Sequence, residues 1–192
     1  MESGQSFNFK RFIITFACGF AGSLAVGLLV YQGHIFRITE NRFLYTALGF
    51  AGALVFSVML FRGLKDSILT MFAVYLLNLV VCKSFFISYI IRDIAVFGSF
   101  WLCLYLYYNW LYNSTGKYKD LRALGLGIIS AIILFITGLF LLFINVPLEK
   151  ISIDTIYTVS MFYLLAGFLI GLGLGLGFDL SEFLITKNIF GI

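Results

Sequence analysis

The chain has 192 residues, of which 61% are hydrophobic and 11% charged, and its net charge is +4. Its mean hydropathy is +1.04. A soluble domain of this length needs far more polar surface, so the composition excludes that class and favours helices in a lipid bilayer. The alternation of apolar and polar residues typical of a membrane β-barrel is absent. No nucleic-acid partner is expected.

Six apolar blocks are long enough to cross a membrane as helices, since a span needs roughly 20 residues. They predict an all-α integral membrane protein that forms a single bundle over residues 1–192. The predicted spans are Phe12–Tyr31, Phe43–Phe61, Ile68–Ile91, Ile94–Tyr112, Leu121–Val146 and Thr155–Gly177. The first block is too long for a removable signal, so we expect the first helix to be retained.

The turn between the third and fourth spans has two possible positions. We place it at Arg92 and Asp93, because these are the charged residues that interrupt the apolar run there. The alternative places it at Lys83, which gives a shorter third helix and a longer fourth one.

Lysine and arginine residues near the span ends predict the orientation, because cytoplasmic loops carry more of them. With both termini inside, the inner set is Lys10, Arg11, Arg62, Lys65, Lys117, Lys119, Arg122 and Lys187, and the outer set is Arg37, Arg42, Arg92 and Lys150. This two-to-one excess predicts a multi-pass protein of the cell inner (plasma) membrane with cytoplasmic termini.

One candidate binding site lies on the third span. Tyr75, Asn78 and Cys82 share one helix face, because they are spaced at i, i+3 and i+7. Lys83 borders this face at a depth where a cation needs a partner, a water-filled cavity or an anionic ligand. With the turn at Arg92 and Asp93, no acidic residue lies within any span, so the solute that contacts Tyr75, Asn78 and Lys83 is expected to be anionic. Two structural alternatives stay open: Asn78 links two helices, and Lys83 extends to the interface.

Signatures of catalysis are missing. The chain has no HExxH motif, no nucleophile elbow and one histidine, His34, so we expect no enzyme activity, cofactor or metal site.

Glycine recurs at every second position in the sequence "GLGLGLG" from Gly171 to Gly177. No lysine followed by serine or threonine comes after it, so it is not a phosphate-binding loop. On a helix, two residues advance the direction by about 200°. Gly167, Gly171 and Gly175 therefore form one packing row, and Gly173 and Gly177 form a second row on roughly the opposite face. Gly125 and Gly127 of the fifth span offer one matching surface, and the other neighbour is in this chain or in another subunit.

The sequence "DLSEFLITKNIF" that follows resembles a capping box, with Asp179 at the N-cap and Glu182 at N3. It predicts a break near Gly177 and a short interfacial helix at residues 180–190.

These observations favour a transport-class component that binds or passes a small, anionic solute within the six-helix bundle. The alternative is a non-catalytic structural or assembly subunit of a larger membrane complex. The expected partners are the lipid bilayer and other membrane subunits, or a second copy that associates through the sixth helix.

Overall fold

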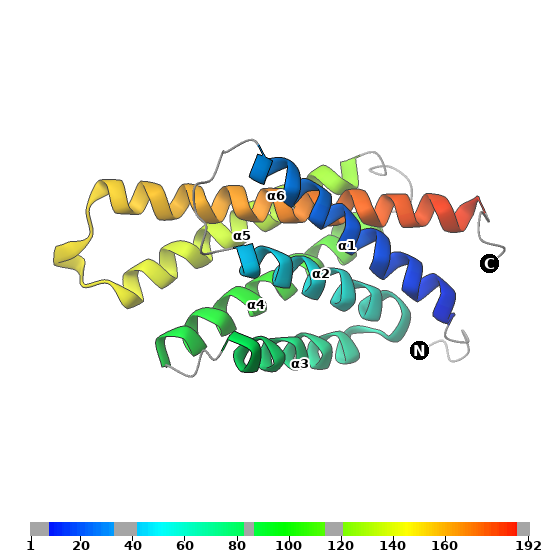
Figure 1. The fold of residues 1–192 in the computed structure, drawn as a ribbon, viewed down its shortest axis with the longest axis horizontal. Coiled ribbons are helices and arrows are strands. Elements are labelled where there is room, and N and C mark those ends of the chain that lie inside the picture. Colours follow the sequence, from blue (N-terminus) through cyan, green and yellow to red (C-terminus); the bar gives the residue numbers. More distant parts are fainter. Residues whose placement is uncertain (1–7, 33–41, 83–86, 114–120, 188–192) are drawn as a thin grey trace.

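The structure is a computed structural model that describes residues 8–32, 42–82, 87–113 and 121–187 (Figure 1). Within these ranges all regular secondary structure is helical, with no strand. The α-helices are α1 (Phe9–Gln32), α2 (Arg42–Arg62), α3 (Leu64–Cys82), α4 (Ile87–Tyr107), α5 (Arg122–Asn145) and α6 (Ile153–Thr186). A π-helical segment, η2 (Tyr108–Tyr112), continues α4, and a 3₁₀ turn, η4 (Leu148–Lys150), precedes α6.

In the described part of the chain, five helices are long and apolar enough to cross a membrane, judged by length and composition. These candidate spans are Phe9–Leu28, Leu64–Val81, Ile90–Tyr112, Arg122–Asn145 and Ile153–Thr186. The apolar part of α2, Ala47–Arg62, is shorter than the 18 residues required of a candidate span. The chain is therefore an apolar helical bundle compatible with a membrane protein, and the count of six spans stays a prediction.

Local sequence accounts for several helix ends. The Asn8 side chain accepts a hydrogen bond from the Arg11 backbone N–H at 3.1 Å, and the Ser152 hydroxyl accepts one from the Thr155 N–H at 3.1 Å. These side chains satisfy N–H groups that the first helical turn leaves without a partner. Gly63 joins α2 to α3 with φ +95°, a left-handed conformation that favours glycine.

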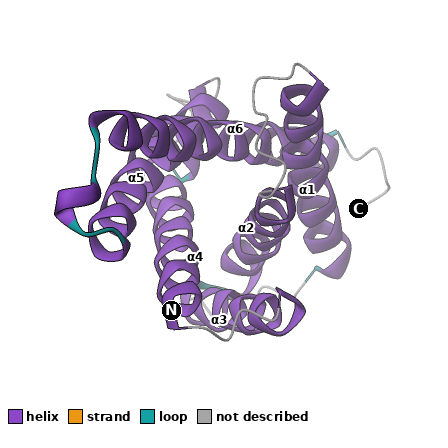
Figure 2. Cartoon of the chain, turned by 60° about the vertical axis from the view of Figure 1, so that its left-hand side comes forward, coloured by secondary structure: helices purple, strands orange, loops and turns teal. Residues whose placement is uncertain are grey.

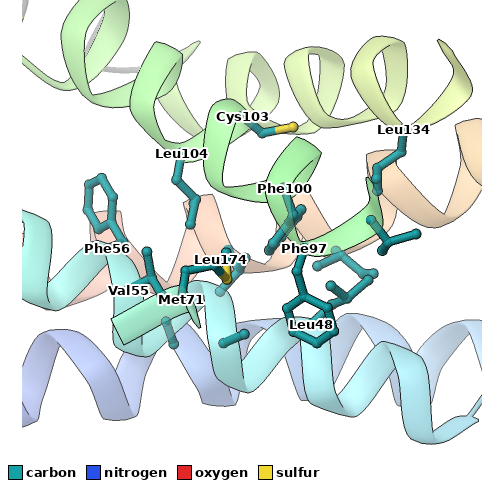
Figure 3. Packing of buried hydrophobic residues seen from close by; sticks show 14 of the residues in the cluster. Leu48, Val55, Phe56, Met71, Phe97, Phe100, Cys103, Leu104, Leu134 and Leu174 are labelled. Carbon is teal, nitrogen blue, oxygen red and sulfur yellow. The ribbon is translucent and has the colours of Figure 1, made fainter. Parts of the chain in front are cut away.

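Helix α2 is the central element of the bundle. It contacts α1, α3, α4 and α6, and Figure 2 shows it enclosed among these helices. Nearly every residue from Ala51 to Met59 is buried, as expected for a helix that is apolar on all faces. Figure 3 shows the core that results, in which side chains of α2, α4 and α6 meet; among them are Val55, Phe56, Phe97, Phe100, Leu104 and Leu174.

The glycines of α6 face two different neighbours. A Cβ added at Gly173 would lie 2.7 Å from the Gly22 carbonyl oxygen of α1, and one at Gly177 would overlap the Cys18 backbone. On the other face, a Cβ at Gly171 would lie 2.6 Å from the Leu126 carbonyl oxygen of α5. Glycine thus lets the α6 backbone touch the backbones of both helices, and both neighbours belong to this chain.

The remaining members of the rows and the glycines of α5 complete this arrangement. A Cβ at Gly167 would overlap Ser130 and one at Gly175 would overlap Ala123, both on α5. Gly127 faces Phe168 of α6, whereas Gly125 faces Leu111 of η2. Of the two α5 glycines, Gly127 therefore belongs to the contact with α6.

The preferred boundary between the third and fourth spans is wrong. Helix α3 ends at Cys82 and α4 begins at Ile87, so Arg92 and Asp93 lie inside α4. The alternative turn position, Lys83, lies outside the described residues. Arg92 and Asp93 lie in the second turn of α4. A helix can hold this charged pair here because the Asp93 carboxylate accepts hydrogen bonds from Asn78 and Arg92.

The predicted break near Gly177 is also wrong. Helix α6 continues without interruption from Ile153 to Thr186, and Asp179 lies within it. The helix continues because α1 and α5 pack against its glycines, which offsets their low helix propensity. The predicted interfacial helix at 180–190 is, as far as Thr186, the last part of α6, and residues 188–190 lie outside the described residues.

Helices that follow one another in the sequence run in opposite directions, so the start of α1 and the end of α6 lie at one end of the bundle, on the right in Figure 1. We call this the terminal end. Gly177 opposes Cys18 and Gly173 opposes Gly22, which fixes the direction of α6 against α1. The described cations of the predicted inner set lie at helix ends on this side: Lys10, Arg11, Arg62, Lys65, Arg122 and Lys187. Arg92 and Lys150 lie toward the other end.

The close approach of α6 to its neighbours can be tested with Gly171→Leu and Gly173→Leu. Each substitution is expected to lower the free energy of unfolding by about 1–3 kcal/mol or more, because the atoms in the way are backbone atoms. The measurement is the thermal unfolding midpoint of the detergent-solubilised protein. Gly98→Leu is the matched control, since a Cβ at Gly98 meets no atom within 4 Å. Equal midpoints for Gly173→Leu and Gly98→Leu would contradict the α1–α6 contact.

Candidate functional site

A buried carboxylate joins α3 to α4. The Asn78 side chain donates a hydrogen bond from Nδ2 to Oδ2 of Asp93 at 3.1 Å. Asp93 is 1% exposed and Asn78 is 8% exposed. A carboxylate in an apolar bundle is costly unless it is paired and hydrogen-bonded, so this contact is a candidate for a functional role.

The second oxygen of Asp93 is held by Arg92. Oδ1 accepts a hydrogen bond from Arg92 Nε at 2.8 Å and lies 2.7 Å from Nη2. The Arg92 side chain is 38% exposed, so its charge reaches the bundle surface while the carboxylate stays inside. Asp93 is thereby linked to the interior through Asn78 and to the surface through Arg92.

Aromatic side chains surround this cluster. Tyr75 of α3 is 7% exposed, and its ring packs edge-on against Phe97 of α4 with centroids 6.2 Å apart. Tyr75 and Tyr163 of α6 both lie within electrostatic range of Asp93. The structure therefore brings together the predicted site residues Tyr75 and Asn78, and adds Asp93 to them.

A small cavity lies about one helical turn from Asp93. Its volume is about 10 Å³, and it is lined by Leu48, Val96, Leu134, Phe162, Tyr163, Ala166 and Ile170. This volume is close to that of one water molecule, and the apolar lining offers a water few partners. The cavity therefore has room for about one water molecule, and Asp93 is not among its lining residues.

Lys83, the third predicted site residue, lies outside the described residues, so its part in the site stays a prediction. An anionic solute, however, no longer follows from an absence of acidic residues in the helices. Asp93 lies within α4, and Asp179 and Glu182 lie within α6, so acidic residues do occur in the helices.

The sequence around Asp93 carries a signal for a continuous helix. No glycine or proline accompanies the Arg92–Asp93 pair, and Asp93 continues a row at helical spacing on α4. The members of this row are Asp93, Phe97, Phe100, Leu104 and Tyr107, and all are 0–1% exposed.

A second polar cluster closes the terminal end. Arg122, the first residue of α5, donates from Nη1 to Glu182 Oε2 of α6 at 2.7 Å and from Nη2 to the Tyr112 carbonyl oxygen at 3.0 Å. Its guanidinium also lies 5.0 Å from the centroid of the Tyr112 ring. One side chain that is 6% exposed thus joins η2, α5 and α6.

Aromatic packing separates the two clusters. Phe56 stacks on Phe178 with centroids 4.2 Å apart and contacts Tyr107 at 5.4 Å. Phe100 and Leu104 are fully buried between this group and the Asp93 level of α4. The bundle therefore has a polar cluster toward each end and an apolar, aromatic middle.

The part of the chain that the structure describes holds no group of three His, Cys, Asp or Glu side chains placed to bind a metal ion. No protein family, curated protein or solved structure matches the chain. The described residues alone define its class: an all-helical, apolar bundle with helices long and apolar enough to cross a membrane.

The Asn78–Asp93 contact predicts an energetic coupling between α3 and α4. Asn78→Leu is expected to lower the free energy of unfolding by about 1.5–3 kcal/mol, the range of a hydrogen bond to a charged group. Thermal unfolding of Asn78→Leu, Asp93→Leu and the double variant measures the coupling. Asn145→Leu, at an exposed amide toward the same end of the bundle, is the control. Additive single effects would show that the two side chains do not interact.

The Arg122–Glu182 ion pair predicts a different pattern. Glu182→Gln is expected to cost about 3–5 kcal/mol, because it leaves a buried guanidinium without its counter-charge. Arg122→Met combined with Glu182→Gln is expected to recover part of this loss, since no charge then needs compensation. Unfolding midpoints in detergent provide the comparison, with exposed Lys187→Gln as control. If Glu182→Gln melts like Lys187→Gln, the ion pair does not hold this end together.

Proposed function

We propose that the chain is a multi-pass membrane protein of the transport class, in which Asp93 takes up and releases a proton. The observation that carries the proposal is the Asp93 carboxylate itself, 1% exposed inside an apolar helix and held by Asn78 and Arg92. Ionisable residues within membrane helices commonly serve ion pathways and proton relays. The carboxylate of Asp93, the amide of Asn78 and the phenol of Tyr75 favour transport of a proton over the anionic solute expected from the sequence.

The position of the two polar clusters supports this proposal. Asp93 lies six residues into α4, which corresponds to a depth of about 9 Å at about 1.5 Å per residue. Arg122 and Glu182 close the terminal end. A proton that enters toward Asp93 would therefore meet a closed aromatic layer, as expected for a protein that exposes its site to one side at a time.

We also propose that the chain crosses the inner (plasma) membrane of the cell six times and has both termini in the cytoplasm. The support is the terminal end, where the described part of the chain gathers six of its lysine and arginine residues at helix ends. Lys83 follows Cys82, the last residue of α3, in the sequence. We propose that it contributes to transport by the same site.

The alternative, an assembly subunit of a larger complex, drew its support from a sixth helix with two packing faces. Helices α1 and α5 of the same chain occupy the two glycine rows. Association with other subunits or with a second copy would therefore use a different surface, and no contact described here favours it over transport.

Proton flux through proteoliposomes tests the proposal. The full chain is reconstituted with the pH-sensitive dye pyranine inside, and a potassium diffusion potential, negative inside, is set with valinomycin. We expect wild-type protein to acidify the lumen faster than protein-free liposomes. Asp93→Asn should abolish the difference, because an amide, unlike a carboxyl group, does not ionise near neutral pH.

Asp154→Asn is the matched control, because Asp154 is an exposed carboxylate at the start of α6. It should leave the flux unchanged, and circular dichroism should show that both variants keep their helix content. Wild-type flux equal to that of empty liposomes, or an Asp93→Asn flux equal to wild type, would overturn the proposal.

A further inference from the structure

The positive charge of the terminal end is unevenly distributed. Arg122 is buried against Glu182, and Lys187 lies over the Phe183 ring at 6.0 Å, on the same helix as Asp179 and Glu182. Among the described residues, the α5–α6 side of this end therefore carries two basic and two acidic side chains. Four further exposed cations lie on the other side, at the start of α1, the end of α2 and the start of α3.

We call this group the basic corner, and its members are Lys10, Arg11, Arg62 and Lys65, all exposed. Two contacts bring it together. The Phe12 ring at the start of α1 packs edge-on against the Phe61 ring at the end of α2, with centroids 6.3 Å apart. The chain then turns at the single residue Gly63 and begins α3 at Leu64, so Lys65 lies only three residues after Arg62.

The basic corner has a positive charge among the residues that the structure describes. Its described carboxylate is Asp66, half-buried in the first turn of α3, against the cations Lys10, Arg11 and Lys65. Because the corner is exposed, its field acts on whatever lies beside it within a Debye length of about 10 Å.

Exposed apolar side chains continue directly from the charges. Phe9 and Ile13 flank Lys10 and Arg11 on α1, and they are 61% and 44% exposed. Along α3 an exposed apolar face runs away from Lys65; its members are Leu64, Ile68, Leu69, Phe72, Leu76, Leu77, Val80 and Val81. A soluble anion or an acidic protein segment would use the charges but not this face.

We propose that the basic corner binds the headgroup of an anionic phospholipid. The phosphate lies at Lys10, Arg11 and Lys65, and the acyl chains lie along the exposed apolar face of α3. Each lysine or arginine near an anionic membrane surface strengthens binding by about fivefold. The proposal rests on the membrane placement proposed above and is independent of proton transport.

Native mass spectrometry of the full chain in neutral detergent tests this proposal. The probes are dioleoyl phosphatidylglycerol, dioleoyl phosphatidylcholine and soluble glycerol 3-phosphate. We expect wild type to bind phosphatidylglycerol more tightly than phosphatidylcholine. The Lys10→Gln, Arg11→Gln, Lys65→Gln triple variant should lose on the order of 100-fold in phosphatidylglycerol affinity.

Two controls make the result specific. Lys150→Gln removes an exposed charge from the other end of the bundle and should keep wild-type affinity. A triple variant that keeps the charge, with Lys10→Arg, Arg11→Lys and Lys65→Arg, should also keep it. Glycerol 3-phosphate should not displace the lipid, because it lacks acyl chains.

Equal affinity for the two lipids, wild-type affinity in the triple glutamine variant, or displacement by glycerol 3-phosphate would each overturn the proposal. Failure to bind either lipid would count against the membrane placement itself. Loss of proton flux in Asp93→Asn has no bearing on lipid binding, so the two proposals fail separately.

Discussion

The backbone contact between α6 and its two neighbours is the constraint on which the bundle depends. Without side chains at Gly173 and Gly177, α1 lies against the α6 backbone, and the row through Gly171 brings α5 equally close on the other face. Helix α1 then positions α2, whose residues from Ala51 to Met59 fill the centre. Gly63 returns the chain at once into α3. The path of α1 to α3 therefore depends on the small residues of a helix that begins about 110 residues after α2 starts.

This packing also determines where polar groups are stable. The centre is filled by Phe56, Phe100 and Phe178 with little space between them, so an unpaired charge has no place there. The buried charged side chains of the described residues lie toward the two ends, and each has a partner on another helix: Asp93 with Asn78, and Arg122 with Glu182. Each pair joins two helices that are antiparallel neighbours. The ion pair and the hydrogen bond thus hold the ends of helices whose middles are held by aromatic and glycine contacts.

Hydropathy was sufficient to predict most helices, and helical spacing was sufficient to predict which α6 glycines share a face. Prediction from hydropathy and local patterns failed where charged residues lie inside a helix. Arg92 and Asp93 resemble a turn because the partner that stabilises Asp93 is 15 residues away in sequence. Asp179 and Glu182 resemble a capping box because the partner of Glu182, Arg122, is 60 residues away. Local patterns carry no information about such partners, so the site around Asp93 could be only half predicted, through Tyr75 and Asn78.

The bonds of Asp93 connect protonation to the contact between α3 and α4. As a carboxylate, Asp93 accepts from Asn78 at Oδ2 and from Arg92 at Oδ1. A proton on Oδ2 turns this atom into a donor, which then faces the donating Nδ2 of Asn78. The amide must rotate to present its oxygen, and Arg92 loses the charge that holds it. Helix α3 is joined to α4 through side chains, including Ser67 with Trp101 and Tyr75 with Phe97, whereas α6 is joined to α1 through backbone atoms. Under the proposed role of Asp93, protonation would therefore act on an interface that side-chain rotation can change, and it would leave the glycine contacts of α6 in place.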